Sequence, residues 1–532
     1  MKLLEVNNLS LSLKQEENWN PILSSLSFYL SKGEILGVVG ESGSGKSVTA
    51  LSIMKLLSAK NSKVTAGEIY FSENRNQNSE WIIEQIRGNR IAMIFQEPMT
   101  SLNPVLKCGT QVAEALLLHT SISKKEAKLR TIELFQDVQL PEPEKVFHKY
   151  PHELSGGQKQ RVMIAMAMCC NPDILIADEP TTALDVTVQK SILELLKLLQ
   201  KKNGMGIIFI SHDLGVIAQI AQRVLVMHKG VIVEQGNVWD IFNNPQHSYT
   251  KSLLDCRKQL DECNKQKAIC NKEIFNITNL CKFYEIKKEN LFEKQKFFQA
   301  LYDINLTIYE GETLGLVGES GCGKTTLGRT LLRLIEPESG NIFYNGINLR
   351  AVSKKMLRNF RKEIQIIFQD PYSSLNQRFT IGQMLLEPMQ VHNILSSETA
   401  RQKRAIELLE RVGLAEMHLH RYPHEFSGGQ RQRIAIARAL SLNPKFIVCD
   451  ESVSALDLSV QFQVLNLLSE LKREFHLTYL FISHDLAVVK YMSDRIAVMQ
   501  KGRIIELNDS EEIYNNPKTE YTKQLIDAIP KM

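Results

Sequence analysis

Two short glycine-rich segments of this chain carry the residue types and the spacing that bind phosphate. One is GESGSGKS at positions 40–47, and the other is GESGCGKT at positions 318–325. Both follow the pattern GxxxxGK[ST], whose glycines allow backbone N–H groups to surround phosphate oxygens. The helix expected after each segment directs its positive N-terminal end toward the same anion. The two segments therefore predict two nucleotide sites in one polypeptide.

The residue types in each loop indicate how ATP and Mg²⁺ would be held. The lysines, Lys46 and Lys324, are expected to reach the β- and γ-phosphates. The hydroxyls that follow, on Ser47 and Thr325, are expected to ligate Mg²⁺. Cys322 has Lys324 and converging N–H groups beside it, which predict an enhanced thiolate fraction. The other loop residues expected to contact ATP are Gly40, Glu41, Ser42, Gly43, Ser44, Gly45, Val48, Gly318, Glu319, Ser320, Gly321, Cys322, Gly323 and Thr326.

An aspartate and a glutamate follow an apolar segment in each half. Asp178 and Asp450 stand where a carboxylate can hold the Mg²⁺ shell beside a phosphate loop. Glu179 and Glu451 come next and are expected to polarise the attacking water, which is the work of a general base. A buried structural carboxylate is the alternative interpretation of each.

A glutamine and a histidine complete the set in each half. The glutamines follow an Ile-Phe pair and are expected to sense Mg²⁺ and water. The histidines follow apolar segments and are expected to hydrogen-bond the γ-phosphate, although a single histidine there would usually be structural. The expected Mg²⁺ ligands are Ser47, Gln96, Asp178, Thr325, Gln369 and Asp450. The expected catalytic residues are Glu179, His212, Gln96, Glu451, His484 and Gln369.

A second anion-binding corner is predicted in each half by LSGGQ at 154–158 and FSGGQ at 426–430. A serine and two glycines at a helix start present backbone N–H groups to an anion. The phosphate loop of the same module already holds the γ-phosphate, so this corner is useful only to another module. We therefore expect the halves to share two ATP sites head to tail, with pseudo-twofold symmetry. The residues concerned are Ser155, Gly156, Gly157, Gln158, Ser427, Gly428, Gly429 and Gln430.

The segments between these motifs predict an α/β fold that is present twice. β-type segments open each half, and a helix is expected to begin at the Lys-Ser or Lys-Thr pair. A mostly helical stretch separates each IFQ segment from SGGQ, and wholly apolar runs such as ILIAD suit buried parallel strands. The prediction is a P-loop α/β core with an antiparallel β subdomain and an inserted helical subdomain in each copy. The expected domains are 1–254 and 274–532, joined by a linker at 255–273.

Composition narrows the class of protein. The net charge of +5 is small for 532 residues, so a nucleic-acid partner is not expected. No apolar run approaches the roughly 20 residues that span a bilayer, and the first residues do not resemble a signal peptide. A location in the cytosol or at the cytosolic side of a membrane is expected.

The 9 cysteines form no CxxC pair. Cys256, Cys263 and Cys270 would share one helix face, but an iron–sulfur cluster there is not expected.

Two polar segments lie outside the repeated motifs. The joint at 255–273 contains no Gly or Pro and predicts a helical connector. The basic and aromatic segment at 285–299 predicts a solvated loop, and a partner-contact loop is the alternative.

The recurring motifs resemble those of the ATP-binding cassette (ABC) ATPases over nearly the whole chain. FQEPMTSLNP, YPHELSGGQ and the ends HSYTKSLL and EYTKQLI are similar to the oligopeptide, dipeptide and nickel importer ATPases. A fused chain with a short linker is most similar to the type that serves peptide and microcin C import. The resemblance implies an ATPase, working with Mg²⁺ and ATP at the cytoplasmic side of a bacterial inner membrane. It also implies two permease subunits docked near 97–150 and 370–422, and a periplasmic substrate-binding protein.

Some residues depart from the family pattern. Tyr284 matches the aromatic residue that stacks on adenine, whereas Leu13 stands there in the first half and Trp19 is a candidate substitute. Ser452 and Phe426 replace a usual proline and leucine, but neither change removes a catalytic group. The alternatives are a tandem ABC ATPase acting on ribosomes or nucleic acid, and an importer ATPase for nickel, glutathione or a sugar.

Overall fold

A computed structural model describes residues 1–15, 17–71, 86–97, 101–182, 184–261, 272–286, 296–454 and 456–529. These residues divide into two compact units. The first is built from Met1–Leu184 and Val188–Asp255, and the second mainly from Cys256–Ile529. Each unit is an α/β structure with a six-stranded sheet and a smaller antiparallel sheet, so the predicted fold class is confirmed.

The six-stranded sheet of the first unit has the strand order β5-β6-β7-β3-β8-β9. All neighbouring pairs are parallel except β8 and β9. Every residue of β3, β5, β6 and β7 is buried, as expected for parallel strands that are covered on both faces. The strands are β3 Ile35–Val39, β5 Ile91–Ile94, β6 Ile174–Asp178, β7 Gly206–Ile210, β8 Arg223–His228 and β9 Val231–Asn237.

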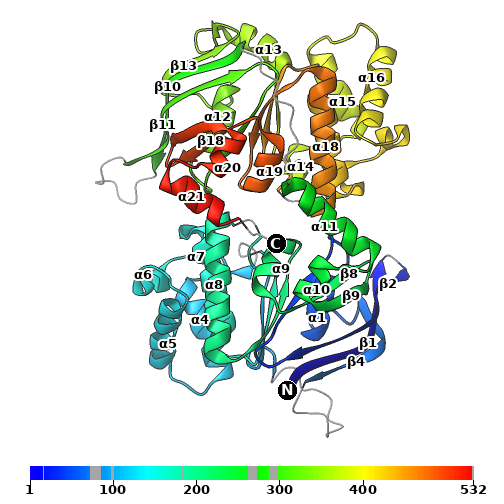
Figure 1. The fold of residues 1–532 in the computed structure, drawn as a ribbon, viewed down its shortest axis with the longest axis vertical. Helices are drawn as coiled ribbons and strands as arrows, with labels where there is room; N and C mark the ends of the chain where they lie inside the picture. The colour runs from blue at the N-terminus through cyan, green and yellow to red at the C-terminus, as the bar shows by residue number, and fades with distance from the viewer. Residues whose placement is uncertain are drawn as a thin grey trace. The chain divides into compact units, whose positions relative to one another are not determined.

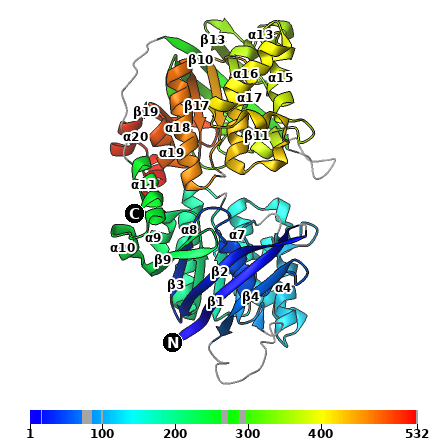
Figure 2. The ribbon, with the colours of Figure 1, turned by 90° about the vertical axis from the view of Figure 1, so that its right-hand side faces the viewer.

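The antiparallel sheet of the first unit has the order β2-β1-β4 and is drawn in blue in Figure 2. Its strands are β1 Lys2–Gln15, β2 Asn18–Ser31 and β4 Ser62–Phe71. Leucines that alternate along β1 and β2, such as Leu4, Leu9 and Leu26, are buried in one cluster with residues of β3, β6 and β7. The two sheets therefore share one hydrophobic core.

The helices of the first unit fall into two groups. The helical insert gathers at one side of the unit (Figure 1), and it consists of α4 Cys108–His119, α5 Lys124–Asp137, α6 Pro143–His148, η1 Pro151–Glu153 and α7 Gly156–Met168. Helix α5 begins at a capping box, in which Ser123 and Glu126 each bind the other's backbone N–H. The remaining helices are α1 Lys46–Ile53, α8 Val186–Asn203, α9 Leu214–Ile220, α10 Val238–Asn243 and α11 Ser248–Asp261, whose residues from Cys256 on belong to the second unit.

The second unit repeats this plan. Its six-stranded sheet has the order β15-β16-β17-β12-β18-β19, and its antiparallel sheet has the order β11-β10-β13-β14. The strands are β10 Glu273–Ile286, β11 Lys296–Tyr309, β12 Thr313–Val317, β13 Ser339–Tyr344, β14 Ile347–Asn348, β15 Ile364–Ile367, β16 Phe446–Asp450, β17 Thr478–Ile482, β18 Arg495–Gln500 and β19 Arg503–Asp509. The helices are α12 Lys324–Leu331, α13 Lys354–Glu363, α14 Pro371–Ser374, α15 Ile381–Val391, α16 Glu398–Arg411, η2 Glu416–His420, η3 Pro423–Glu425, α17 Gly428–Leu440, α18 Leu458–Phe475, α19 Leu486–Met492, α20 Ser510–Asn515 and α21 Glu520–Asp527.

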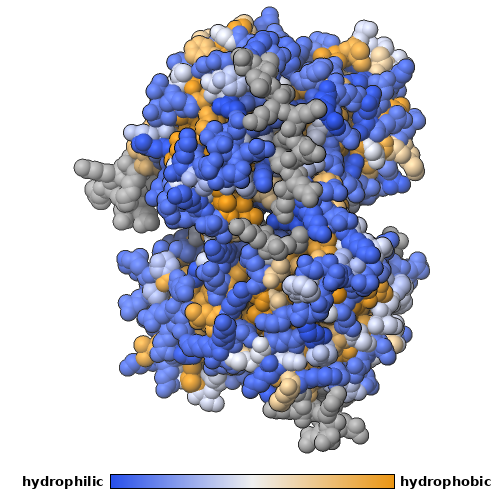
Figure 3. Space-filling view, viewed as in Figure 1, coloured by the Kyte–Doolittle hydropathy of each residue, from blue (hydrophilic) through white to orange (hydrophobic). Residues whose placement is uncertain are grey.

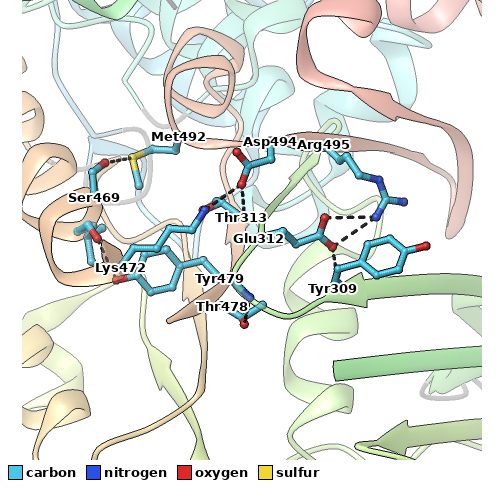
Figure 4. A network of polar contacts seen from close by, with 12 residues as sticks. Tyr309, Glu312, Thr313, Ser469, Lys472, Thr478, Tyr479, Met492, Asp494 and Arg495 are labelled. Atoms are coloured by element: carbon cyan, nitrogen blue, oxygen red, sulfur yellow. Dashed lines mark hydrogen bonds and ion pairs between the residues drawn. The ribbon is translucent and has the colours of Figure 1, made fainter. Parts of the chain in front are cut away.

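A polar network ties strand β12 to helix α18 and strand β18 in the second unit (Figure 4). Asp494 accepts hydrogen bonds from the backbone N–H of Thr313 at 2.7 Å and from the ammonium of Lys472 at 2.8 Å. In the first unit the corresponding side chains are neutral amides, and the contact to the strand N–H is the one that has a counterpart there. Gln222 accepts from the N–H of Ile35 at 2.6 Å, and the Gln200 amide donates to the Gly33 carbonyl at 2.6 Å. The same position in the fold is therefore held by an ion pair in one copy and by uncharged groups in the other.

The two polar segments outside the motifs are described only at their ends. Helix α11 continues to Asp261, so the segment predicted as a helical connector at 255–273 starts as helix, while its last residue, Glu273, begins strand β10; residues 262–271 lie outside the described residues. Strand β10 runs to Ile286 and β11 starts at Lys296, so both ends of the predicted 285–299 loop are strand. Residues 287–295 lie outside the described residues. Hydrophilic side chains cover most of the face drawn in Figure 3.

Candidate functional site

The phosphate loop of each unit connects the central strand of the sheet to a helix. Strand β3 ends at Val39 and α1 begins at Lys46, while β12 ends at Val317 and α12 begins at Lys324. The helix starts are thus at the predicted residues. The first glycine of each loop is required by its surroundings. A Cβ on Gly40 would lie 2.2 Å from the Met227 carbonyl oxygen, and Gly318 meets the same obstacle in the second copy.

The lysine of each loop is buried against the loop's own carbonyl groups. The ammonium of Lys46 donates to the carbonyls of Gly40 at 2.7 Å and Glu41 at 2.9 Å. Lys324 makes the same two contacts, at 2.6 Å and 2.9 Å. Since only 5% of Lys46 is exposed, its charge is held at the loop rather than in bulk solvent. A fixed ammonium beside a cluster of backbone N–H groups is suited to binding a polyphosphate.

The hydroxyl of the residue after each lysine donates a hydrogen bond to an aspartate. That aspartate ends β6 or β16, which lies two strands away in the sheet from the strand that leads into the loop. Ser47 donates to an Oδ1 of Asp178 at 3.1 Å, and Thr325 donates to Oδ1 of Asp450 at 2.9 Å. The sheet explains this pairing, because β3 and β6 both flank β7 in parallel and their carboxyl ends meet at one edge. A hydroxyl and a carboxylate side by side are the protein ligands that a nucleotide-bound Mg²⁺ takes.

The electrostatics of the two aspartates fit a cation at this place. Burial raises the pKa of Asp178 to about 6, although the Ser47 hydrogen bond opposes the rise. Burial also raises the pKa of Asp450, whose Oδ2 makes no hydrogen bond to any described residue. The guanidinium of Arg329 is 3.9 Å from that oxygen. A divalent cation would add positive charge beside these buried carboxylates, so the residues present fit Mg²⁺.

Glu179 lies at the centre of a set of hydrogen bonds in the first unit. Its Oε2 is contacted by the Gln96 amide at 3.1 Å, the Thr182 hydroxyl at 2.9 Å and Nδ1 of His212 at 3.1 Å. Burial alone would raise its pKa, but the His212 and Thr182 contacts and the charge of Lys46 hold it below the usual value. The carboxyl is therefore ionised at neutral pH, which a base that orients water requires.

Glu451 has a similar but sparser environment in the second unit. The Gln369 amide donates to its Oε2 at 2.7 Å, and Nδ1 of His484 is 3.5 Å away. The Ser454 hydroxyl instead donates to the backbone carbonyl of Glu451 at 3.0 Å. Burial would lower the pKa of His484, but Glu451 raises it above the usual value, and the histidine holds the pKa of Glu451 down in turn. The two glutamates thus share a role but differ in how many donors hold them.

Both glutamates have a left-handed backbone, with φ of 45° at Glu179 and 46° at Glu451. A residue with a Cβ pays a steric cost there, which functional sites often carry. The conformation turns the chain sharply after the aspartate, so that successive carboxylates leave the strand in different directions. This explains why Asp178 contacts Ser47 while its neighbour Glu179 contacts Gln96.

The Ser-Gly-Gly-Gln segments begin helices in both units, as predicted. Ser155 is the N-cap of α7, and its hydroxyl accepts from the Gln158 N–H at 3.3 Å while Gln158 accepts from the Ser155 N–H at 3.2 Å. Ser427 and Gln430 form the same capping box at α17. A Cβ on Gly157 would lie 2.7 Å from Val188, so the second glycine permits close packing. The glycine pairs at these helix starts are Gly156, Gly157, Gly428 and Gly429.

The structure brings the predicted lysine, hydroxyl, aspartate, glutamine, glutamate and histidine of each unit into one set, through hydrogen bonds and through neighbours in the chain. In the first unit the set comprises Gly40, Glu41, Lys46, Ser47, Gln96, Asp178, Glu179 and His212. In the second it comprises Gly318, Glu319, Cys322, Lys324, Thr325, Gln369, Asp450, Glu451 and His484. Ser155 and Ser427 are outside these sets and bind their own helices.

The prediction of a reactive thiolate at Cys322 is wrong. The side chain is only 6% exposed, and burial raises the pKa of the thiol. Lys324, whose ammonium is 3.8 Å from the sulfur, opposes this rise without overcoming it. The sequence shows the nearby charge but not the burial, and burial is the larger effect here.

The remaining predictions concern aromatic, cysteine and metal positions. Tyr284 pairs with Phe298 across β10 and β11 and is 38% exposed, and Trp19 on β2 is 45% exposed, so both rings are accessible. Cys256 lies on α11, whereas Cys263 and Cys270 fall outside the described residues. Within the described ranges, no group of three or more His, Cys, Asp or Glu side chains could hold a metal ion by itself.

Several residues near the sites were missed by the sequence analysis. Thr182 contacts Glu179, and Arg329 forms an ion pair with Asp450 where the first copy has Leu51. The hydroxyls of Tyr249 and Tyr521 also accept hydrogen bonds from the phosphate loops. The shared Tyr-Thr-Lys in HSYTKSLL and EYTKQLI was a signal for the tyrosines, because it recurs after both modules.

Comparison with known proteins places these features in a family. Residues 23–182 and 301–454 match the family model described as ABC transporter. Residues 233–285 and 505–532 match the one described as oligopeptide/dipeptide transporter, C-terminal region. The glutathione import ATP-binding protein GsiA of Escherichia coli strain K12 is 46% identical over 559 residues, covering 99% of this chain and 89% of that protein. The protein of the same name from Pectobacterium atrosepticum is 44% identical, with 99% and 90% covered. The solved structure of cbiO1 from Clostridium perfringens has 28% identity and a TM-score of 0.40, covering 46% of this chain and 92% of that one.

Proposed function

Because this chain belongs to the ABC transporter family and is an ATP-hydrolysing, ATP-binding subunit of the importer type, we propose that it energises the import of peptides or peptide-like compounds. The observation that carries the ATPase assignment is the set of Lys, hydroxyl, Asp, Gln, Glu and His present in both units. We propose residues 1–254 and 274–532 as two nucleotide-binding domains, joined by a linker at 255–273.

The roles of the site residues follow from their contacts. Lys46 and Lys324, with the N–H groups of their loops, bind the phosphates of ATP. The Mg²⁺ that accompanies ATP supplies charge neutralisation, and Ser47 with Asp178 is the pair that would hold it in the first unit. Thr325, Gln369 and Asp450 serve the second unit in the same way, and Gln96 serves the first. The other residues of each phosphate loop contribute backbone N–H groups to the phosphates, as the sequence predicts.

Hydrolysis needs a base that is ionised and fixed. Glu179 and Glu451 are held by donors on Oε2, their pKa values are lowered, and each accepts a proton from the attacking water. His212 and His484 contact the same oxygens and stabilise the ionised form. We propose that the serine–glycine corners at Ser155 and Ser427 complete the sites of the opposite halves head to tail, because each half's own loop already serves its phosphate.

The class of cargo is supported by the C-terminal segments and by the relatives. Residues 233–285 and 505–532 match a region described for oligopeptide and dipeptide transporters. The relatives are named for glutathione, which is itself a tripeptide derivative. Peptide-like cargo is common to both. Microcin C has no support in these comparisons.

The partners proposed for this chain are two permease subunits and, through them, a substrate-binding protein. A groove of about 350 Å³ in the second unit lies between β15, α15 and α17. Apolar Ile367 and Leu375 lie beside charged Arg361 and Glu387 in its lining, which suits an amphipathic permease helix. Tyr372 is 51% exposed near this region. In the described ranges, no helix is long and apolar enough to cross a membrane, and we propose a peripheral place at the cytoplasmic face.

Uptake measurements test the cargo. In the source organism, deletion of this gene should abolish uptake of labelled glutathione or of short peptides and leave uptake of nickel and of a sugar unchanged. A plasmid with the natural gene should restore uptake, whereas Lys46→Ala with Lys324→Ala should not. If peptide and glutathione uptake survive deletion while nickel or sugar uptake is lost, the proposed cargo is wrong. If deletion affects no uptake at all, the importer assignment itself is wrong.

A further inference from the structure

The C-terminal part of each unit contacts the phosphate loop through a tyrosine hydroxyl. The backbone N–H of Glu41 donates to Oη of Tyr249 at 3.1 Å. The backbone N–H of Glu319 donates to Oη of Tyr521 at 3.0 Å. The tyrosines are on α11 and α21, in the segments that match the oligopeptide/dipeptide transporter C-terminal region. The same contact thus occurs twice, across more than 200 residues of sequence each time.

The peptide group whose N–H donates to the tyrosine also positions the loop lysine. The carbonyl of Gly318 and the N–H of Glu319 belong to one peptide group; its carbonyl accepts from the Lys324 ammonium at 2.6 Å, while its N–H donates to Tyr521. This peptide group is therefore held from both sides. The peptide group between Gly40 and Glu41 is held by Lys46 and Tyr249 in the same way. The hydroxyl fixes the plane of a peptide that directs the ammonium.

Each tyrosine is fixed in turn by the strand before its helix. The carboxylate of Glu506 on β19 accepts from the backbone N–H groups of Lys518 at 2.9 Å and Thr519 at 3.2 Å, just before α21. Glu234 on β9 binds the N–H groups of Gln246 and His247 before α11. Tyr521 also packs in the hydrophobic core of the second unit, beside Leu525. The segments that carry the tyrosines are consequently held by hydrogen bonds in both copies, and Tyr521 is also held by core packing.

The turn between the last two strands provides a second contact to each loop. The N–H of Gly230 donates to the carbonyl of Ser44 at 3.0 Å, and the N–H of Gly502 donates to that of Cys322 at 3.0 Å. The hairpin and the helix that carries the tyrosine therefore hold the loop at two peptide groups. One lies near the start of the loop and the other lies just before its lysine.

We infer that the C-terminal hairpin and helix of each unit set the geometry of the phosphate loop, with Tyr249 and Tyr521 as positioning residues for nucleotide binding. This inference rests on the proposed assignment of the loops to ATP. Without the hydroxyl, the N–H of Glu319 or Glu41 loses its acceptor and the lysine loses a fixed partner. ATP must then order the loop as it binds, which weakens affinity. Bound ATP restores the loop, so turnover at saturation is preserved.

The test is the substitution of both tyrosines by phenylalanine in the full chain. The Kd for Mg·ATP, measured in the Glu179→Gln, Glu451→Gln background, should rise about three- to tenfold. The KM for ATP should rise with it in the active chain, while kcat and the thermal midpoint without nucleotide stay within error. Tyr514→Phe is the matched control, because its hydroxyl binds the Leu486 carbonyl on the same C-terminal segment and not the loop. It should leave Kd unchanged.

Two outcomes would overturn the inference. An unchanged Kd would show that the hydroxyls do not act on the loop. A lower thermal midpoint, with a Kd shift equal to that of Tyr514→Phe, would show a structural role alone. Glu319→Pro removes the N–H donor, so Tyr521→Phe should add nothing in that background. The double variant Lys46→Ala, Lys324→Ala should abolish Mg·ATP binding. If it still binds, the assignment of the loops to ATP is wrong, and this result is separate from the test of the tyrosine contact.

Discussion

Replacing the two glutamates by glutamine tests the proposed chemistry most directly. Glutamine keeps the size of the side chain and retains a carbonyl oxygen that can accept from Gln96 or Gln369. It cannot take a proton from water. Loss of a general base costs typically 10²–10⁴ in rate, which is about 2.7–5.5 kcal/mol. We expect Glu179→Gln and Glu451→Gln each to lower steady-state ATP turnover, and the double variant to lower it by the full amount.

The single variants also show how the two sites depend on each other. If hydrolysis at one site proceeds without the other, each single variant loses about half of the turnover. If both must act in one cycle, each single variant falls by the full 10²–10⁴. The assay is phosphate release by the purified chain at saturating Mg·ATP, with Kd for Mg·ATP measured in parallel to show that binding survives. A single variant with the natural turnover would falsify the assignment of its glutamate as a base.

Two further predictions concern the stability of the second unit. Lys472→Gln should destabilise it by about 1–3 kcal/mol, because Asp494 is left largely buried without its cation. Adding Asp494→Gln, which approximates the neutral amides of the first unit, should recover most of that loss in calorimetry; a double variant no better than the single would contradict this. Glu506→Gln should lower the thermal midpoint at pH 7, because hydrogen bonds to Glu506 outweigh the effect of burial and hold its pKa low. This contribution is complete above the unfolded value of about 4.3 and is lost as the pH falls through the lower folded value, so a midpoint difference that does not shrink at acid pH would refute it.

The sequence was sufficient to predict site residues that lie close together in the chain within one motif. Lys46 and Ser47 are neighbours in one pattern, and Gln96 and Asp178 each stand at or just after the end of an apolar segment that forms a strand of the sheet. Contacts between residues far apart in sequence carry no such pattern. Tyr521 contacts Glu319 although the two are 202 residues apart in the sequence, and neither residue type predicts the other as its partner. Burial was also inaccessible, which is why the charge near Cys322 suggested a thiolate that the structure does not favour.

The left-handed backbone conformation of the two glutamates lowers the stability of the fold, whereas the proposed hydrolysis requires a glutamate at each of these positions. Glycine adopts this conformation without the steric cost, which is roughly 1–2 kcal/mol for other residues. A copy released from selection for hydrolysis would therefore gain stability by exchanging Glu179 or Glu451 for glycine. Both copies carry glutamate in this strained conformation. In each half the carboxylate and the steric cost therefore come together, because a glycine would relieve the cost only by removing the carboxylate.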